Sequence, residues 1–367
     1  MEVTAWAPGR VNIVGEHTDY NNGLVLPIAI DLGTWATVGV NTSSGIEITS
    51  AQFPGERFNV TDTNIQSLPH WARYVAGSAL TFMKSTDITS GLRVHVDSTV
   101  PLGAGLSSSA SVECAIIVAL DELFHANLPK LVIAELAQQA EHVYANVPCG
   151  LMDQVASMFG QIGEAILFDV KDMQIESLAF NPESSGVGLL VCDTKIRHSL
   201  AQGEYAIRRS QCNDASALLG LSSLRDVVSI ADLDELPEIL RKRARHVVTE
   251  NTRVLSVVGA ATSGDWKRVG DLISKSHESL RDDFEVSIDE IDHAVSAAQN
   301  HGALGARIVG GGFGGSILIL CENDNFKSVS EAVVRSLVID GIDSPTLRTF
   351  SPTSGAHVVA DSKDILG

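Results

Sequence analysis

A glycine- and serine-rich segment, PLGAGLSSSAS at residues 101–111, constrains the fold more than any other part of the chain. The alternating apolar and polar run that precedes it, LRVHVDSTV at 92–100, predicts a strand. Apolar residues then recur at helical spacing over 112–124. Gly103 and Gly105 let the backbone approach a ligand closely, and the N–H groups at the start of a helix favour an anion. The segment therefore predicts a strand, an anion-binding turn and a helix.

This turn matches neither of the two common nucleotide-binding motifs. The chain contains no GK[ST] sequence, which excludes a Walker A loop, and Ser108 replaces the third glycine of a dinucleotide-binding fingerprint. The simpler alternative is a helix N-terminus that happens to be rich in serine. Ser107 adds a hydroxyl that can reach a metal ion.

Charge and length narrow the classes of partner. The 367 residues are enough for two or three domains, and 44% of them are hydrophobic, as in globular proteins. The apolar runs are shorter than the roughly 20 residues that a membrane span needs. A formal net charge of −19 repels nucleic acid and anionic membranes at long range. We expect no nucleic-acid or membrane partner, and an anionic ligand would have to be held by local donors.

The cysteines and the N-terminal sequence indicate a reducing compartment. The cysteines are odd in number and widely spaced, with no CxxC pair, so we expect them to be reduced and mostly packed. They are Cys114, Cys149, Cys192, Cys212 and Cys321. MEVTAWAPGR has no basic stretch followed by an apolar one, so we expect a cytoplasmic location.

The other patterns predict an order of elements and a boundary. Strands and hairpins dominate residues 3–60, and helical spacing dominates 200–300. The change between the two regimes near 171–187 predicts a domain boundary. We further expect helices from Pro129 to before Pro148 and over 150–159, 237–261 and 325–339, strands at 164–170 and 186–194, and a capping box of Ser287 with Glu290.

A dense group of polar residues lies in the segment APGRVNIVGEHTDYNNGLVLP at 7–27. Five of them fall within eleven residues between two apolar strands: Arg10, Glu16, His17, Asp19 and Tyr20. Carboxylates and an imidazole can satisfy several sugar hydroxyls at once, so the loop suits a hydroxyl-rich ligand. The alternative is a solvated loop with chance charges.

Two further candidate carboxylates, Glu141 and Asp153, lie between residues 141 and 154. Asp153, in NVPCGLMDQ at 146–154, falls in the first turn of the short helix, where the dipole favours its ionised form. There it can accept a proton or hydrogen bond from a hydroxyl, or it can merely stabilise the helix. Glu141 lies near a helix end, where its charge opposes the dipole, which hints at a cation partner.

A second glycine-rich segment is VGGGFGGS at 309–316. Five glycines around one phenylalanine let two backbones, or a backbone and a phosphate, come close. The alternative is a tight loop between strands.

Together these segments resemble the GHMP family of small-molecule kinases. Residues 9–27 are similar to the galactokinase signature of that family, 101–111 to its phosphate loop and 309–316 to its third motif. KIRHSLAQGEYAIRRSQC at 195–212 resembles the stretch that supplies a sugar-contacting tyrosine. The matches occur in the family's order and cover nearly the whole chain.

The resemblance implies an architecture and an activity. It implies an α+β fold of two domains, 1–175 and 176–367, with the active site in the cleft between them. The implied reaction transfers the γ-phosphoryl group of MgATP to the anomeric hydroxyl of galactose, giving galactose 1-phosphate and ADP. Galactose is then the small-molecule partner, ATP and Mg²⁺ are the cofactors, and the oligomeric state stays open.

The resemblance also assigns residues to roles. Asp153 and Arg10 match the catalytic pair, and whether Asp153 removes the proton or only orients the hydroxyl stays open. The sugar ligands would be Glu16, His17, Asp19, Gly150, Asp153, Tyr205 and Arg197. The ATP phosphates would lie against Pro101, Leu102, Gly103, Ala104, Gly105, Leu106, Ser107 and Ser108, and Mg²⁺ would bind Ser107 and Glu141.

The chain departs from the family pattern at a few positions, and two other functions remain. Trp6 stands where arginine is usual, and Ile308 and Val309 replace the usual Met and Thr. One alternative is another GHMP sugar 1-kinase, acting on N-acetylgalactosamine or arabinose. The other is a sugar sensor without turnover, which the intact phosphate loop and Asp153 disfavour.

Overall fold

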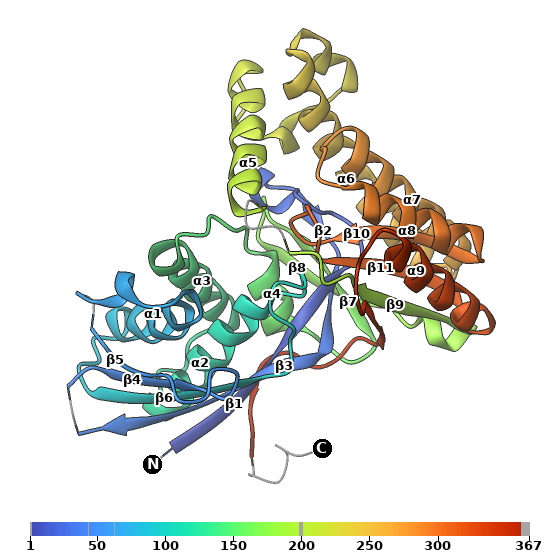
Figure 1. The fold of residues 1–367 in the computed structure, drawn as a ribbon. Coiled ribbons are helices and arrows are strands. Elements are labelled where there is room, and N and C mark those ends of the chain that lie inside the picture. Colours follow the sequence, from blue (N-terminus) through green and yellow to red (C-terminus); the bar gives the residue numbers. More distant parts are fainter. Residues whose placement is uncertain (1, 43, 62, 198–200, 361–367) are drawn as a thin grey trace.

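Strands and helices alternate along the chain in the computed structural model, which describes residues 2–42, 44–61, 63–197 and 201–360. They form three sheets, with helices packed around them (Figure 1). The expected α+β class is confirmed. None of the described helices is long and apolar enough to cross a membrane.

The N-terminal half is built on a six-stranded sheet in the order β13-β1-β3-β6-β4-β5. All neighbours are antiparallel except β4 and β6. The strands are β1 (Glu2–Asn12), β3 (Pro27–Asn41), β4 (Ile46–Ser50), β5 (Arg57–Val60), β6 (Gly91–Ser98) and β13 (His357–Val358). Helices α1 (His70–Ser85), α2 (Ser108–Phe124), α3 (Lys130–Ala140) and α4 (Met152–Phe159) cover one face (Figure 1).

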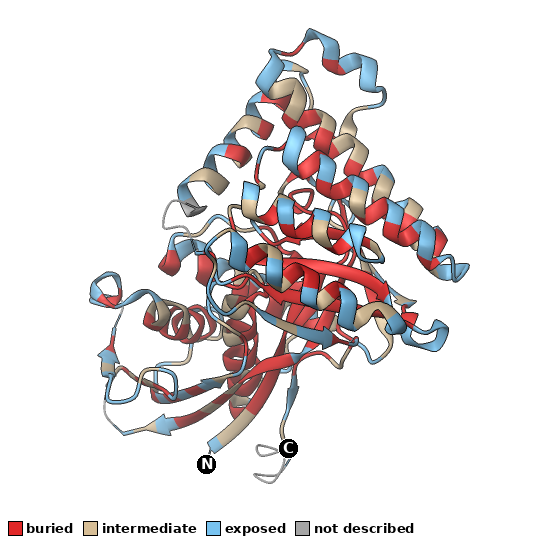
Figure 2. Cartoon of the chain, turned by 45° about the vertical axis from the view of Figure 1, so that its right-hand side comes forward, coloured by how far each residue is buried: buried red, intermediate tan, exposed pale blue. Residues whose placement is uncertain are grey.

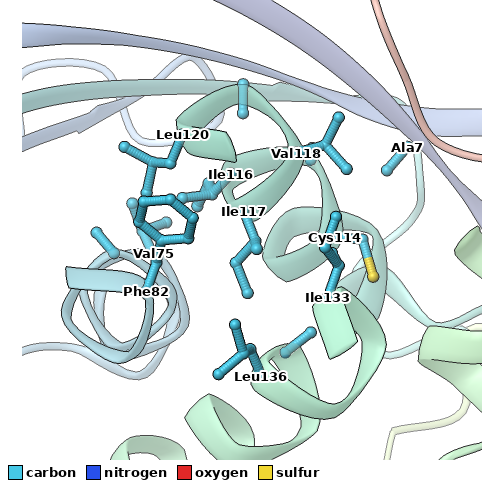
Figure 3. Packing of buried hydrophobic residues seen from close by; sticks show 14 of the residues in the cluster. Ala7, Val75, Phe82, Cys114, Ile116, Ile117, Val118, Leu120, Ile133 and Leu136 are labelled. Carbon is cyan, nitrogen blue, oxygen red and sulfur yellow. The ribbon is translucent and has the colours of Figure 1, made fainter. Parts of the chain in front are cut away.

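Helix α2 lies at the centre of this half because most of its surface is covered. It packs against β1 and β3 as well as α1, α3 and α4. Ile116, Ile117 and Leu120 of α2 are fully buried and meet Phe82 of α1 and Ile133 of α3 (Figure 3). Each such side chain contributes about 1.5–3 kcal/mol by leaving water. The predicted strand, turn and helix over 92–124 are confirmed.

The C-terminal half is built on a four-stranded antiparallel sheet in the order β10-β11-β9-β12. Its strands are β9 (Val187–Asp193), β10 (Ala303–Val309), β11 (Ser316–Glu322) and β12 (Thr346–Phe350). Its helices are α5 (Ala201–Leu218), α6 (Glu238–Thr262), α7 (Trp266–Asp282), α8 (Asp289–Asn300) and α9 (Phe326–Ile339).

Both faces of this sheet are buried, which explains the unbroken apolar run of β9. Leu189 and Val191 lie in one core with residues of α6 and α7. Leu190 and Cys192 lie in another core with residues of α8 and α9. β9 is buried along its whole length and β11 at every residue but its last, whereas the edge strand β12 is mostly exposed; Figure 2 shows long buried strands, in red, beneath the helices.

The two halves share a core. Val11 and Ile28, from the ends of β1 and β3, lie in the same hydrophobic cluster as Leu189 and Leu318. A small sheet in the order β2-β7-β8 adds to it, made of β2 (Leu24–Val25), β7 (Glu164–Asp169) and β8 (Gln174–Ala179). A division between residues 175 and 176 would fall inside β8, and β13 returns from the end of the chain to β1. The domain boundary itself stays a prediction.

Short helical turns complete the description. The 3₁₀ turns are Asp19–Asn21, Ile65–Ser67, Pro182–Ser185, Leu224–Asp226, Ile230–Glu235 and Asn323–Asn325, and Glu141–Ala145 is a π-helical turn that continues α3. The predicted helices and strands are confirmed to within a few residues.

One local prediction is wrong. Ser287 does not cap a helix, because α8 begins after Ile288 and has no side-chain cap. The Ser287 hydroxyl instead donates to Asp292 Oδ1 at 2.5 Å. The cysteines behave as expected: all five are free, and all but Cys149 are buried.

Candidate functional site

A cavity of about 560 Å³ lies where the two halves meet. Its walls come from five segments far apart in sequence: the start of the polar loop, the first glycine-rich turn, the residues between α3 and α4, the start of α5, and the second glycine-rich loop. Among the predicted site residues it is lined by Arg10, Glu16, His17, Asp19, Gly103, Gly105, Glu141, Gly150, Asp153, Arg197 and Tyr205. The structure thus brings eleven of the seventeen predicted site residues to one cavity.

The turn between β6 and α2 is shaped by its glycines. Gly103 and Gly105 have φ of 69° and 73°, a conformation that other residues rarely adopt. A Cβ at Gly105 would lie 3.1 Å from the carbonyl oxygen of Val309 in the second glycine-rich loop. The two loops therefore meet backbone to backbone, and the first-turn N–H groups of α2 point outward without intrahelical acceptors.

Arg10 reaches the site because β1 bulges between Pro8 and Arg10. A Cβ at Gly9 would lie 2.5 Å from the Leu106 carbonyl oxygen, so glycine is needed for this approach. The Arg10 Nε donates to Asp153 Oδ1 at 2.8 Å, and Nη1 donates to the Gly105 carbonyl at 2.7 Å. The guanidinium is therefore held between the first glycine-rich turn and α4.

Asp153 is tied down at both carboxylate oxygens and still faces the cavity. Its Oδ1 accepts from Arg10, and its Oδ2 accepts from the Ser107 hydroxyl at 2.5 Å. Its side chain is 24% exposed, against 6% for Arg10. A carboxylate held this way can accept a hydrogen bond or a proton from a hydroxyl in the cavity.

Glu16 is buried in an ion pair between the halves. Its Oε1 accepts from Arg307 Nη2 and from the Gly310 backbone N–H at 3.0 Å. Arg307 is fully buried on β10. The interaction was not predicted, because nothing in the sequence near Arg307 marks it as the partner of Glu16.

His17 is a neutral imidazole with a free nitrogen. Burial lowers its pKa well below the usual value, and the nearby His246, Arg208 and Arg307 lower it further. Its Nδ1 pairs with the Tyr20 hydroxyl at 2.9 Å, and its Nε2 has no hydrogen-bond partner among the described residues. That nitrogen is a buried polar atom without a partner, in a side chain that lines the cavity.

Asp19 lies against Gly150, at a position that has no room for a side chain. A Cβ at Gly150 would come within 1.7 Å of Asp19 Oδ2. Burial raises the pKa of Asp19 to about 6, and the charges of Asp153 and Glu16 also raise it. Its Oδ1 accepts from the Tyr20 backbone N–H at 2.9 Å, which partly offsets this rise in pKa.

Glu141 is a buried carboxylate beside Asp153. It begins the π-helical turn after α3, and such turns are frequent at functional sites. Burial and the Asp153 charge raise its pKa to about 7, and its Oε2 accepts from the Gln154 amide at 3.0 Å. A cation would offset the clustered negative charge, so the donor set of Glu141 and the Ser107 hydroxyl suits Mg²⁺ carried by phosphates. The described residues contain no group of three His, Cys, Asp or Glu that could hold a metal alone.

Arg197 and Tyr205 approach from the C-terminal half. Arg197 donates to the Leu102 carbonyl at 3.2 Å and to Asp193 at 2.8 Å, which sets it over the phosphate loop. The Tyr205 ring lies 5.5 Å from that of His17. Residues 198–200 of the matched stretch lie outside the described residues.

A second cavity, of about 480 Å³, adjoins the phosphate loop and shares Gly103 with the first. Leu102 and Ser108 line it, together with the aromatic residues Phe53, Trp71 and Tyr74. Pro101, Ala104, Leu106 and Ser107 line neither cavity, but the Ser107 hydroxyl donates to Asp153, which lines the first.

Sequence reasoning missed a buried acidic residue behind the site. Glu113 of α2 is fully buried, and the Gln154 amide donates to both Glu113, at 3.3 Å, and Glu141. A glutamate inside an otherwise apolar helix face was the available signal.

Three family models match the chain. They are the GHMP kinases N terminal domain over residues 73–161, the galactokinase galactose-binding signature over 2–40, and the GHMP kinases C terminal model over 257–339. The galactose-binding model covers the polar loop with Arg10, Glu16, His17 and Asp19.

Proteins of known family and solved structures give the same family assignment as these models. A galactokinase of Streptomyces coelicolor is 40% identical over 96% of this chain and 92% of its own length. A galactokinase of Mycobacterium tuberculosis is 39% identical over 97% and 99%. The structure of Lactococcus lactis galactokinase complexed with galactose is 31% identical, with a TM-score of 0.90 over 97% of this chain and 95% of that one. The structure of L. major mevalonate kinase in complex with R-mevalonate shares only the fold with this chain, at 20% identity and a TM-score of 0.67. The chain belongs to the GHMP kinase family, in its galactokinase branch.

Proposed function

We propose that the chain transfers the γ-phosphoryl group of ATP to the anomeric hydroxyl of galactose, giving galactose 1-phosphate and ADP. The observation that carries the proposal is the convergence of Asp153, Arg10 and the phosphate loop in one cavity with Glu16, His17 and Asp19. Phosphoryl transfer depends mostly on positioning and on charge neutralisation, and this arrangement offers both.

Each side chain has a role that follows from its contacts. Asp153 orients the anomeric hydroxyl and accepts its proton as the bond to phosphorus forms. Arg10, held beside Asp153, faces the negative charge that develops on the transferred group. The neutral His17 and the carboxylates of Glu16 and Asp19 bind hydroxyls of the sugar, with Tyr205 beside them and Gly150 leaving room for Asp19.

ATP would lie across both cavities. Its phosphates would meet the turn at 101–108 and Arg197, and its base would enter the second cavity between the aromatic side chains. Ser107 and Glu141 would hold Mg²⁺, which neutralises phosphate charge when bound. These local cations and N–H groups offset the repulsion expected from the net charge of −19.

A coupled ADP-release assay over several acceptors tests the proposal. We expect galactose to be phosphorylated well ahead of N-acetylgalactosamine, arabinose, glucose and mevalonate, and phosphorus NMR should place the phosphate on the anomeric carbon. A 6-phosphate product would contradict the proposal. A higher kcat/KM for N-acetylgalactosamine or arabinose would assign the chain to another sugar 1-kinase, and binding of sugar without turnover would make it a sensor.

A further inference from the structure

The loop that carries Glu16 belongs to the N-terminal half by sequence, but the C-terminal half holds it. Its backbone is fixed at two consecutive residues by α6. The Gly15 N–H donates to Glu250 Oε1 at 3.0 Å, and the Glu16 carbonyl pairs with His246 Nε2 at 3.1 Å. Both α6 residues are fully buried.

Arg307 fixes the side chain of the same residue. Its guanidinium is fully buried, and each of its three nitrogens donates a hydrogen bond. Nε donates to the Ile308 carbonyl at 2.8 Å, Nη1 donates to the Ile13 carbonyl at 3.3 Å, and Nη2 donates to Glu16 Oε1. Such a planar group with several fixed acceptors has one orientation, and so has the carboxylate paired with it.

The arrangement leaves one oxygen of Glu16 for the cavity. Oε1 already accepts from Arg307 and from the first N–H of the second glycine-rich loop, at Gly310. Glu16 is 3% exposed and lines the cavity. Its remaining oxygen is therefore the one that can meet a sugar hydroxyl, and its place depends on Arg307.

We propose that Arg307 is a positioning residue for galactose: from β10 it sets the orientation of the Glu16 carboxylate, and it ties that carboxylate to the second glycine-rich loop. Arg307 lines neither cavity, so it acts through Glu16. The inference rests on the proposed function, because it takes Glu16 as a ligand of the sugar.

Arg307→Lys tests the proposal. Lysine keeps the charge but loses the fork that holds Ile13, Ile308 and Glu16 together. We expect the KM for galactose to rise at least about 10-fold, with the KM for ATP changed less than about 2-fold. A displaced Glu16 carboxylate weakens the binding of the sugar that it contacts and not the binding of ATP. Calorimetry of galactose binding in the absence of ATP should show the same loss.

A matched control is Arg243→Lys. Arg243 of α6 is 2% exposed and makes an equally dense set of bonds, to Gln211, to the Asp283 carbonyl and to Glu285, all away from both cavities. We expect both variants to lower the melting temperature, and only Arg307→Lys to change the KM for galactose. Equal galactose KM values in Arg307→Lys and wild type would overturn the proposal.

A double-mutant cycle with Glu16→Gln shows whether Arg307 acts through Glu16. In the Glu16→Gln background, Arg307→Lys should change galactose affinity less than about 2-fold, because the group that it positions is already altered. Full additivity of the two losses would overturn the proposal.

If Arg307→Lys does not fold, the galactose affinity of Glu16→Asp tests the proposal instead. The shorter side chain cannot keep its bond to Arg307 and reach the sugar as well, so galactose affinity should fall at least about 10-fold. Wild-type galactose affinity in Glu16→Asp would contradict the proposal. A wild-type protein that fails to phosphorylate galactose would instead contradict the proposed function.

Discussion

Asp19 is a predicted sugar ligand whose ionised carboxylate lowers the free energy of unfolding near neutral pH. Its pKa is raised from 3.8 to about 6, mainly by burial. The folded protein therefore binds a proton at Asp19 more tightly than the unfolded chain does, and the contribution of Asp19 to stability falls as the pH rises from about 4 to about 6. Near pH 7 the ionised carboxylate costs about 3 kcal/mol.

Asp19→Asn should remove this cost. We expect denaturant unfolding at pH 7.5 to show a gain of up to about 3 kcal/mol, which shrinks on acidification and vanishes below about pH 4, where both states are protonated. Galactose affinity should fall, because a charged acceptor is lost. Unchanged stability at pH 7.5 would show that the carboxylate is better solvated than its burial indicates.

Asp153→Asn separates a kinase from a sensor. Asparagine keeps the size and one acceptor oxygen but loses the basicity, so kcat should fall by roughly 10²–10⁴-fold. Calorimetry should still detect galactose and ATP, since the other ligands are untouched. A variant with more than about a tenth of the wild-type kcat, a barrier change below roughly 1.4 kcal/mol, would leave Asp153 no role as the base.

Glu141→Gln addresses the metal. A neutral amide is a poorer Mg²⁺ ligand than a carboxylate. The Mg²⁺ concentration needed for half-maximal turnover should therefore rise at least about 10-fold, while galactose binding without ATP stays the same. The matched control is Glu135→Gln, an exposed glutamate on the same helix, which should behave as wild type. An unchanged Mg²⁺ requirement would make Glu141 structural.

The site residues differ in how far sequence could predict them. Glu16, His17 and Asp19 lie close together in one short loop, so the sequence of that segment alone indicates a polar site. Arg307 is 291 residues from Glu16 and stands in an apolar strand, where nothing local distinguishes it. Its role follows only from the fold, which brings its guanidinium into an ion pair with Glu16.

At the scale of elements, the spacing of apolar residues predicted the strands and helices correctly where it reflects which faces are buried. The one-sided spacing of β6 and the two-sided run of β9 both follow from which faces are covered. The predicted capping box is absent because α8 begins after Ile288, one residue later than a Ser287 cap requires. The π-helical turn at Glu141–Ala145 was not predicted, because it depends on the packing of α3 against α1 and α4.

The segment between that turn and α4 positions Gly150 against the polar loop. In Gly150→Ala the new methyl group would overlap the Asp19 carboxylate, so one of the two segments must move. We expect the KM for galactose to rise at least about 10-fold, with little change in the KM for ATP.

The control for this variant is Gly259→Ala in α6, where an added Cβ meets nothing within 4 Å. It should raise stability by about 0.5–1 kcal/mol, because alanine favours the helix, and leave both KM values unchanged. A wild-type galactose KM in Gly150→Ala would show that the loop tolerates the shift.

At the scale of the whole molecule, the shared core predicts that the two halves unfold together. Val11 and Ile28 cannot lose their partners on β9 and β11 without exposing both halves. In Trp266→Phe, fluorescence reports only on Trp6, Trp35 and Trp71 of the first half, while circular dichroism reports strongly on the helices of the second. The two melting midpoints should agree within about 1 °C. Two separate transitions would show that the halves fold independently.

The pairing of β13 with β1 has a consequence for synthesis. Ala5 and Trp6 are made some 350 residues before their edge partners, Val358 and His357. Until then the β1 edge presents unpaired N–H and C=O groups, which can pair with strands of other chains. During synthesis the edge of β1 therefore stays open until residues 357 and 358 have left the ribosome, and only then can this side of the sheet close.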